Sequence, residues 1–115
     1  MRIGKAAKQS GISAKMIRYY ESVGLVPRAE RLDSGYREYS SDDVELLQLL
    51  RRARDAGLSL DRAGALVRLW LDDRTKGGEA LNALIVDLET RATAARELAE
   101  LLRSRLRRSG SRSKR

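Results

Sequence analysis

Four polar side chains that can bind nucleic acid lie near the start of the chain: Ser13, Lys15, Arg18 and Tyr19. Arginine can pair with guanine through two hydrogen bonds, lysine and serine can bind phosphate, and tyrosine carries both a hydroxyl and an apolar ring. Any one of these residues is equally common on an ordinary solvated helix. Their clustering on one short helix is typical of an element that enters the major groove of DNA.

A second basic cluster lies around Gly35. Arg31, Tyr36 and Arg37 combine positive charge with an aromatic ring, which suits contact with a phosphate backbone beside the first cluster. Arg54 is a further candidate phosphate contact, although arginine is also a common exposed residue on helices. These residues predict a double-stranded DNA partner.

Two of the side chains most often used in catalysis are missing. The chain contains no cysteine and no histidine, which excludes disulfides, thiol redox chemistry, Cys/His metal sites and histidine acid–base catalysis within this sequence. The two methionines, Met1 and Met16, do not make a soft-metal site. Because the carboxylates are dispersed and no nucleophile has a neighbouring base, we expect no enzyme, no cofactor and no metal.

The positive charge is unevenly distributed. The 115 residues include 24 Lys and Arg against 16 Asp and Glu, a formal net charge of +8. Residues 1–58 account for +3 and residues 59–100 for −2, whereas residues 101–115 contain seven basic side chains and no acidic ones. We expect a basic disordered tail over residues 109–115, because a segment rich in Ser, Gly and Arg cannot sustain a packed element. Such a tail adds only non-specific affinity for phosphate.

The composition indicates a helical protein. Apolar residues make up 42% of the chain and aromatic residues 4%, with many Leu and Ala and a single Pro. No apolar run approaches the roughly 20 residues of a membrane span, and the first residues lack the apolar core of a signal peptide. We therefore expect a cytoplasmic protein with no membrane partner.

Two short helices joined by a glycine turn are expected to position the first cluster. Their inner faces are given by Ile3, Ala6, Ala7 and Ser10, and then by Ile17, Tyr20, Val23 and Leu25. Gly11 interrupts the first pattern and Ser13 can cap the second helix. Ala7, Gly11 and Ile17 have the spacing of a helix-turn-helix, in which a small residue allows close approach, glycine accepts the turn and a branched residue fills the angle.

A β-hairpin and two more helices follow. Asp33-Ser34-Gly35 predicts a hairpin turn, which makes the unit a winged helix, with Tyr39 in the core at the exit of the hairpin. The pattern from Ser40 to Asp43 predicts a capping box before a third helix that ends at Gly57. The core residues expected from the third and fourth helices are Val44, Leu47, Leu50, Leu60, Ala63, Leu66 or Val67, and Trp70. A polar segment over residues 72–78 then favours a domain covering residues 1–75.

A strict heptad pattern occupies the last third of the chain. Its apolar positions are Leu81, Ile85, Leu88, Ala92, Ala95, Ala99, Leu102 and Leu106, separated by alternating steps of four and three residues. This pattern predicts a coiled-coil dimerisation helix over residues 76–108, paired with the same helix of a second copy. The alternative is an intramolecular helix packed on the winged helix, and the periodicity does not distinguish parallel from antiparallel pairing.

Several of these motifs together resemble the MerR family of bacterial transcription regulators. The motifs are Arg18-Tyr19-Tyr20-Glu21, Gly24-Leu25, Gly35-Tyr36-Arg37-Glu38-Tyr39, Leu50-Arg51-Arg52-Ala53-Arg54 and Gly57-Leu58-Ser59-Leu60. Within the family the chain is most similar to the copper-efflux regulator and its metal- or stress-sensing relatives. The resemblance covers residues 1–105 and implies an all-α winged helix-turn-helix domain with a small β wing, followed by a long antiparallel dimerisation helix. It also implies a palindromic operator between the −35 and −10 elements of an overlong promoter spacer, where distorted DNA is presented to RNA polymerase.

The sequence departs from that family pattern at the sensor. The metal-sensing relatives use a cysteine pair in a loop after the dimerisation helix, and here that position is Arg107-Arg108-Ser109-Gly110. Three interpretations remain: a regulator controlled by partners or abundance, a small-molecule site between the wing domain and the dimerisation helix, or a chain lacking its sensor. A competing function is an architectural or excisionase-like DNA-bending factor, although excisionases usually lack a long dimerisation helix.

Overall fold

Two short helices joined at Gly11 begin the chain, as the spacing predicts. Helix α1 covers Ile3–Ser10 and α2 covers Ala14–Ser22. Gly11 has a φ of 77°, a left-handed conformation that glycine adopts without strain, and the Ser13 hydroxyl accepts a hydrogen bond from the backbone N–H of Met16. Ile17 is fully buried between the helices, which confirms its predicted place.

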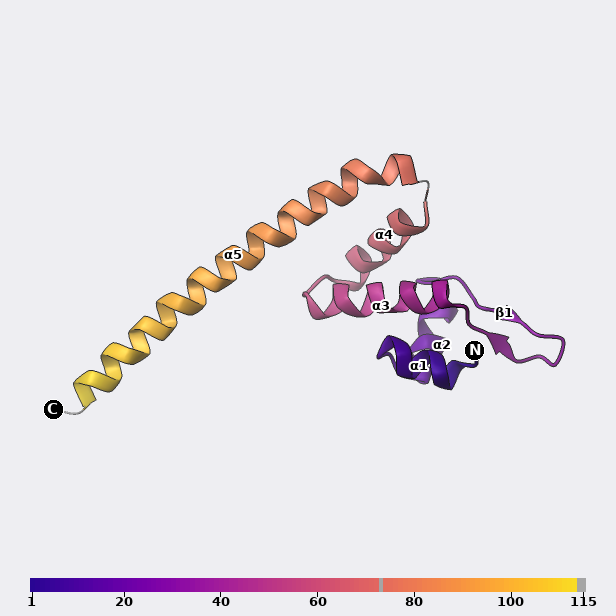
Figure 1. Cartoon of the computed structure of the whole chain (residues 1–115), viewed down its shortest axis with the longest axis horizontal. Helices are drawn as coiled ribbons and strands as arrows, with labels where there is room; N and C mark the ends of the chain where they lie inside the picture. Colours follow the sequence, from indigo (N-terminus) through magenta and orange to yellow (C-terminus); the bar gives the residue numbers. More distant parts are fainter. Residues whose placement is uncertain (73, 114–115) are drawn as a thin grey trace. The chain divides into compact units, whose positions relative to one another are not determined.

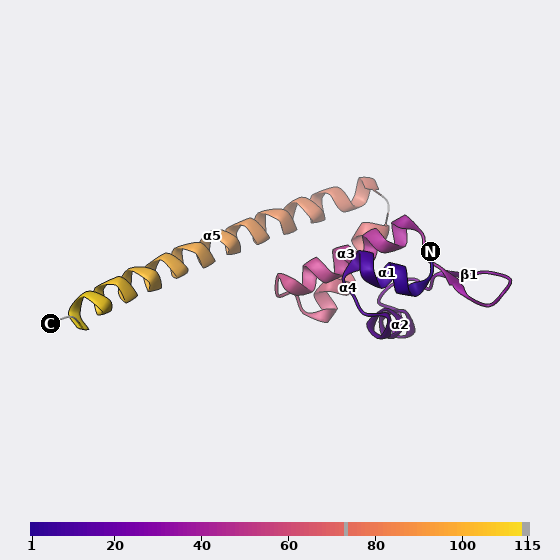
Figure 2. The ribbon, with the colours of Figure 1, turned by 60° about the horizontal axis from the view of Figure 1, so that its bottom comes forward.

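A two-stranded antiparallel hairpin follows as the wing. Strand β1 is Glu30–Arg31 and β2 is Arg37–Glu38, with Glu30 opposite Glu38 and Arg31 opposite Arg37. Gly35 adopts a φ of 88° in the turn between the strands. Figures 1 and 2 show the hairpin projecting from the cluster formed by the first four helices, with the N-terminus near its base.

Helices α3 and α4 complete this cluster. Helix α3 covers Ser41–Asp55 behind the predicted capping box of Ser40 and Asp43, and α4 covers Leu60–Leu71 with Ser59 as its N-cap. Both helices contribute to the core, which contains Ala6, Ile17, Val26, Tyr39, Val44, Leu46, Leu47, Leu50, Ala53, Leu58, Ala63, Leu66 and Val67. Tyr39 is therefore a core residue, as expected.

Two expected inner-face residues are instead exposed. Val23 follows the last residue of α2, at the point where the chain turns into Gly24, and 53% of its surface is accessible. Trp70 lies in the last turn of α4 and is 44% exposed. Helical periodicity gives the face on which a residue lies, but not whether a neighbouring element reaches that part of the face.

The remaining helix, α5, covers the 40 residues Arg74–Ser113. The computed structural model describes residues 1–72 and 74–113, except for the side chains of residues 74–77 and 111–113. The chain divides into two compact units, Met1–Asp73 and Arg74–Arg115. The expected architecture is confirmed: a largely helical chain with a two-stranded wing and a long C-terminal helix.

The ends of α5 differ from the prediction. The helix begins at Arg74 and includes Gly77 and Gly78. It also continues through residues 109–113 of the segment 109–115, for which a disordered tail was expected, and residues 114–115 lie outside the described residues. A glycine or serine in a helix costs only about 0.5–1 kcal/mol, and extending an existing helix adds a hydrogen bond for each residue that is fixed. Arginine is a good helix former and is favoured near a helix C-terminus, where its charge complements the helix dipole.

Candidate nucleic-acid interface

Helix α2 presents the first predicted cluster to solvent. Lys15, Arg18 and Tyr19 are all exposed, with Tyr19 47% accessible. Ser13 lies at the N-cap, where its oxygen already accepts one hydrogen bond and its O–H remains a donor. The structure therefore brings the four residues together on one exposed helix that follows a glycine turn.

The register of the wing places like charges opposite each other. Glu30 pairs with Glu38 and Arg31 with Arg37, an arrangement that destabilises an isolated hairpin. One member of each pair finds a partner of opposite sign outside the hairpin. Arg37 pairs with Glu21, and Glu38 with the amino group of Met1. The wing is thus stabilised by α2 and by the first residue of the chain.

Glu21 connects helix α2 to the wing. Its carboxylate is buried and accepts hydrogen bonds from the backbone N–H of Ala29 at 2.9 Å, the Arg37 guanidinium at 2.8 Å and the Tyr39 hydroxyl at 2.7 Å. The donors precede, belong to and follow the hairpin. A single side chain therefore fixes how the wing is held against α2.

The titration behaviour of this network follows from its burial. Burial raises the pKa of the Tyr39 hydroxyl to about 12, and the hydrogen bond to the Glu21 carboxylate acts in the same direction. The pKa of Arg37 is raised, first by its hydrogen bond with Tyr39 and also by the negative charge of Glu21. Tyr39 and Arg37 thus remain proton donors to Glu21 at neutral pH.

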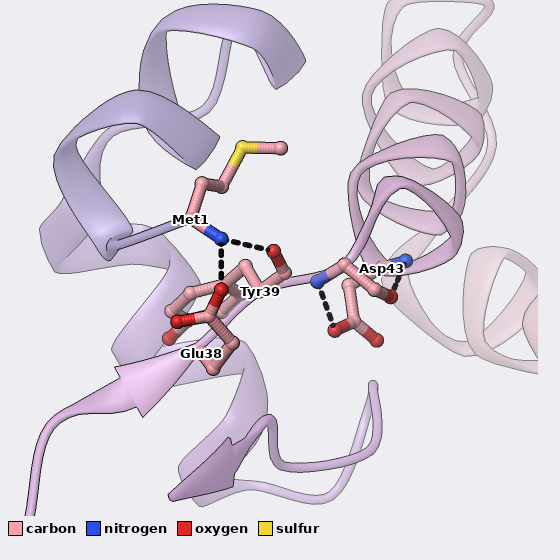
Figure 3. A network of polar contacts seen from close by, with 5 residues as sticks. Met1, Glu38, Tyr39 and Asp43 are labelled. Carbon is pink, nitrogen blue, oxygen red and sulfur yellow. Dashed lines mark hydrogen bonds and ion pairs between the residues drawn. The ribbon is translucent and has the colours of Figure 1, made fainter. Parts of the chain in front are cut away.

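The chain start is joined to the base of the wing. Figure 3 shows the Met1 amino group directed toward the Glu38 carboxylate and the Tyr39 carbonyl oxygen, both 2.7 Å away. The backbone N–H of Tyr39 donates in return to the Met1 carbonyl at 2.6 Å. Next to these contacts lies Asp43, which forms the capping box of α3 together with Ser40.

Only part of the second predicted cluster, around Gly35, is available to contact a phosphate backbone. Arg31 and Tyr36 are exposed, and the Arg2 guanidinium lies 4.1 Å above the centre of the Tyr36 ring. Arg37, by contrast, is partly buried by its contact with Glu21. Arg54 donates to the Leu58 carbonyl at 2.8 Å, so one of its nitrogens closes the turn after α3 while the rest of the side chain is exposed.

Sequence reasoning missed three residues of this region. Glu21 lies four residues after buried Ile17, so a carboxylate on the inner face of α2 was the available signal. Arg2 and Arg28 line a groove between α2 and the wing, but nothing in their sequence context indicated it.

Helix α5 exposes much of its predicted heptad stripe. Leu81 and Leu88 are half-buried, whereas Ile85 is 49% and Leu102 57% exposed. The three alanines of the stripe, Ala92, Ala95 and Ala99, are also exposed. On its own, α5 thus presents a line of apolar side chains to solvent.

The described residues offer neither a metal-binding cluster nor a membrane span. Within residues 1–72 and 74–113, no three His, Cys, Asp or Glu side chains are grouped so that they could hold a metal ion. None of the helices in this part of the chain is both long and apolar enough to cross a membrane.

An exposed second helix after a glycine turn, beside a two-stranded wing, defines the class of winged helix-turn-helix DNA-binding proteins. Residues 1–69 match the family described as "MerR HTH family regulatory protein". The chain belongs to this family of DNA-binding transcription regulators, which confirms the resemblance seen in its motifs.

Named relatives support this assignment. Heavy metal-dependent transcription regulator 2 of Rhizobium meliloti strain 1021 is 42% identical over 107 residues, which cover 90% of this chain and 72% of that protein. The HTH-type transcriptional regulator CueR of Salmonella typhi is 38% identical over 101 residues, covering 88% and 71%. The solved structure of HiNmlR, a MerR family regulator lacking the sensor domain and bound to promoter DNA, matches with a TM-score of 0.75 at 25% identity, over 91% of this chain and 86% of that one.

Proposed function

We propose that two copies of this chain bind a palindromic operator within an overlong promoter spacer and distort the DNA to control initiation by RNA polymerase. The observation that carries the proposal is the arrangement of α2 and the wing, which expose basic and aromatic side chains side by side. The solved structure of HiNmlR, a regulator that lacks the sensor domain and is bound to promoter DNA, supports a DNA-binding role for a chain of this architecture.

The proposed DNA contacts divide into two groups. Lys15, Arg18 and Tyr19 of α2, with Ser13 at its N-cap, contact base edges and phosphates in the major groove. On the wing, Arg31 and Tyr36 contact the neighbouring backbone. The free donors of Arg54 add a phosphate contact, whereas Arg37 positions the wing through Glu21.

The length of α5 supports a dimer. At about 1.5 Å per residue its 40 residues extend over about 60 Å, whereas a compact unit of 73 residues has a radius of gyration of about 11 Å. The unit Met1–Asp73 is too small to cover such a helix along its length. We propose that the stripe from Leu81 to Leu102 packs against the same stripe of a second copy, in antiparallel orientation.

The mechanism then follows from two-fold symmetry. Two winged helices carried by a common coiled coil bind two half-sites at a set separation, and the DNA between them must bend and untwist to reach both. Contacts to the phosphates offset the cost of this deformation, which is of the order of 1–6 kcal/mol for a smooth bend. The promoter elements are thereby realigned for RNA polymerase.

The given sequence lacks the usual ligands for the metals that some relatives' names mention. The Rhizobium meliloti relative is named for heavy metals, whereas this chain contains no cysteine and no histidine with which to bind them. We propose that within this sequence regulation does not pass through a thiolate-bound metal.

Transcription from a series of promoters with different spacer lengths tests the proposal. The operator is first selected from random duplexes, and then placed in spacers that differ by single base pairs. We expect the protein to change initiation most strongly on an overlong spacer and little on a spacer of standard length. Arg18→Gln should abolish this effect.

An architectural or excisionase-like factor would give a different result. It would bend the same duplexes, measured by fluorescence energy transfer between the DNA ends, without changing transcription at any spacer length. That outcome would replace the regulator by the bending factor, and failure to select any duplex would reject both.

A further inference from the structure

An open groove lies between the recognition helix and the wing. It measures about 770 Å³ and is bounded by the first residues of the chain, by α2, by the segment leading into β1 and by the hairpin turn. Arg18 and Tyr36, two of the proposed DNA contacts, form part of its wall. The groove is therefore continuous with the surface assigned to DNA.

The groove carries unneutralised positive charge. Its lining includes four arginines, Arg2, Arg18, Arg28 and Arg37, and no acidic residue. Arg37 forms an ion pair with Glu21, but within residues 1–72 and 74–113 no carboxylate pairs with the other three. Like charges gathered in a concave surface raise the local potential and attract an anion.

Arg2 is held in a position that leaves its donors free. The central carbon of its guanidinium lies over the Tyr36 ring, 4.1 Å from the ring centre. The ring attracts the cation through its π-face, and the N–H donors that do not point at the ring stay available to other acceptors. An arginine held in this way loses less conformational freedom when it binds phosphate.

We propose that this groove binds the DNA phosphodiester backbone beside the recognition helix, with Arg2 and Arg28 as its phosphate ligands next to Arg18. This inference rests on the proposed DNA-binding function and extends it to two residues outside the motifs of the sequence. The groove is open and adjoins the candidate DNA contacts, which favours a continuous backbone over a small free phosphate. Tyr36 has the additional task of orienting Arg2.

The salt dependence of DNA binding provides the test. Arg2→Gln, Arg28→Gln and the double variant are compared with the wild type on the duplex that the wild type selects. A plot of log affinity against log salt concentration has a negative slope. Each lost phosphate contact should make this slope shallower by about 0.9. Between about 50 and 200 mM salt the wild type should then lose about 12-fold more affinity than the double variant. The preference for the selected duplex over a scrambled one should be unchanged.

Two further variants guard against a purely structural explanation. Arg62→Gln removes an exposed arginine of α4 that does not line the groove, and it should leave the slope at the wild-type value. Arg2→Lys keeps the charge but not the planar guanidinium, so it should restore the salt dependence of the wild type. Equal melting temperatures for all variants would confirm that folding is unaffected.

The outcomes separate this inference from the proposed function. If the wild type selects a duplex but the double variant keeps the wild-type slope, the groove does not bind the backbone. If pyrophosphate binds the wild type but not the double variant, while both proteins have the same salt dependence of DNA binding, the groove binds free phosphate instead and the DNA assignment is wrong. If the wild type shows no duplex preference at all, the proposed function itself fails.

Discussion

Glu21 shows how one buried side chain can position the elements of a candidate binding surface. A buried carboxylate is costly unless its oxygens are satisfied, and here three donors satisfy them. All three donors belong to the wing or its flanks, so the burial of Glu21 and the position of the wing depend on each other. This dependence also removes Arg37 from the residues that are free to bind phosphate.

The pH dependence of stability should reveal the Tyr39 hydroxyl. In the unfolded chain a tyrosine loses its proton near pH 10, whereas the pKa of Tyr39 in the folded chain is about 12. Its contribution to stability is therefore complete below about pH 10 and is lost as the pH rises toward 12. We expect the free energy of unfolding in urea to fall by about 2–3 kcal/mol over this range because of Tyr39.

Tyr39→Phe is the matched control for this pH dependence. The variant keeps the ring but has no proton to lose. Its free energy of unfolding should therefore fall by about 2–3 kcal/mol less than that of the wild type over the same pH range. Groups common to both proteins cancel in the difference. An equal fall in both proteins would show that the hydroxyl is not held protonated by the fold.

At the level of elements, α5 is the part whose role depends most on a second copy. The stripe from Leu81 to Leu102 should be buried in a dimer, whereas Val86, 65% exposed, lies beside it. Ile85→Glu would bury a charge in the seam of each chain. We expect the dimer dissociation constant to rise by about 100-fold or more, measured by analytical ultracentrifugation, because a buried unpaired charge costs about 3–5 kcal/mol.

Val86→Glu is the control for the change at the seam. It introduces the same charge one residue away, outside the heptad stripe, and should leave the dimer intact. A stable dimer with Ile85→Glu, or dissociation by Val86→Glu alone, would show that the helices pair along another face. The register inferred from the heptads would then be wrong.

The elements that sequence predicts best are those with local causes. The caps at Ser13 and Ser40 were both predicted, because a cap depends on residues within one turn. The Glu21 network was not, since its partners lie 8 to 18 residues away and meet only after the hairpin has formed. The exposure of Trp70 and the extension of α5 also depend on context that helical periodicity does not contain.

The candidate DNA surface was predicted unevenly for the same reason. Arg18 and Tyr36 could be identified because they belong to motifs, and they lie exposed as expected. Arg2 and Arg28 become neighbours of these residues only through the fold, which brings the chain start and the segment before β1 to the same groove. Family motifs therefore gave part of the surface and the structure adds the rest.

Across the whole molecule, the net charge and the candidate DNA surface are located in different places. Seven of the basic residues lie within residues 101–115, far along the sequence from α2 and the wing. Charge of this kind strengthens binding to any phosphate backbone without reading bases. We expect the specific and non-specific parts of DNA binding to be separable.

Removing residues 109–115 should demonstrate this separation. The deletion removes Arg112, Lys114 and Arg115. The slope of log affinity against log salt concentration should therefore become shallower by no more than about 2.7. The affinity should fall by the same factor for all duplexes. The ratio of affinities for selected and scrambled duplexes should stay constant in filter-binding measurements. Changing the three residues to Gln at full length controls for the shortened helix. A change in that ratio would assign base recognition to this segment.

The length of α5 can be compared with the helical repeat of DNA. The seam from Leu81 to Leu102 covers about 32 Å, close to the about 34 Å of one turn of B-DNA. In the proposed antiparallel pair, the length of this seam contributes to the separation of the two winged helices. Each inserted heptad would lengthen it by about 10.5 Å, or about three base pairs. The proposed dimer therefore predicts that a change in the length of α5 requires a change in the spacing of the operator half-sites.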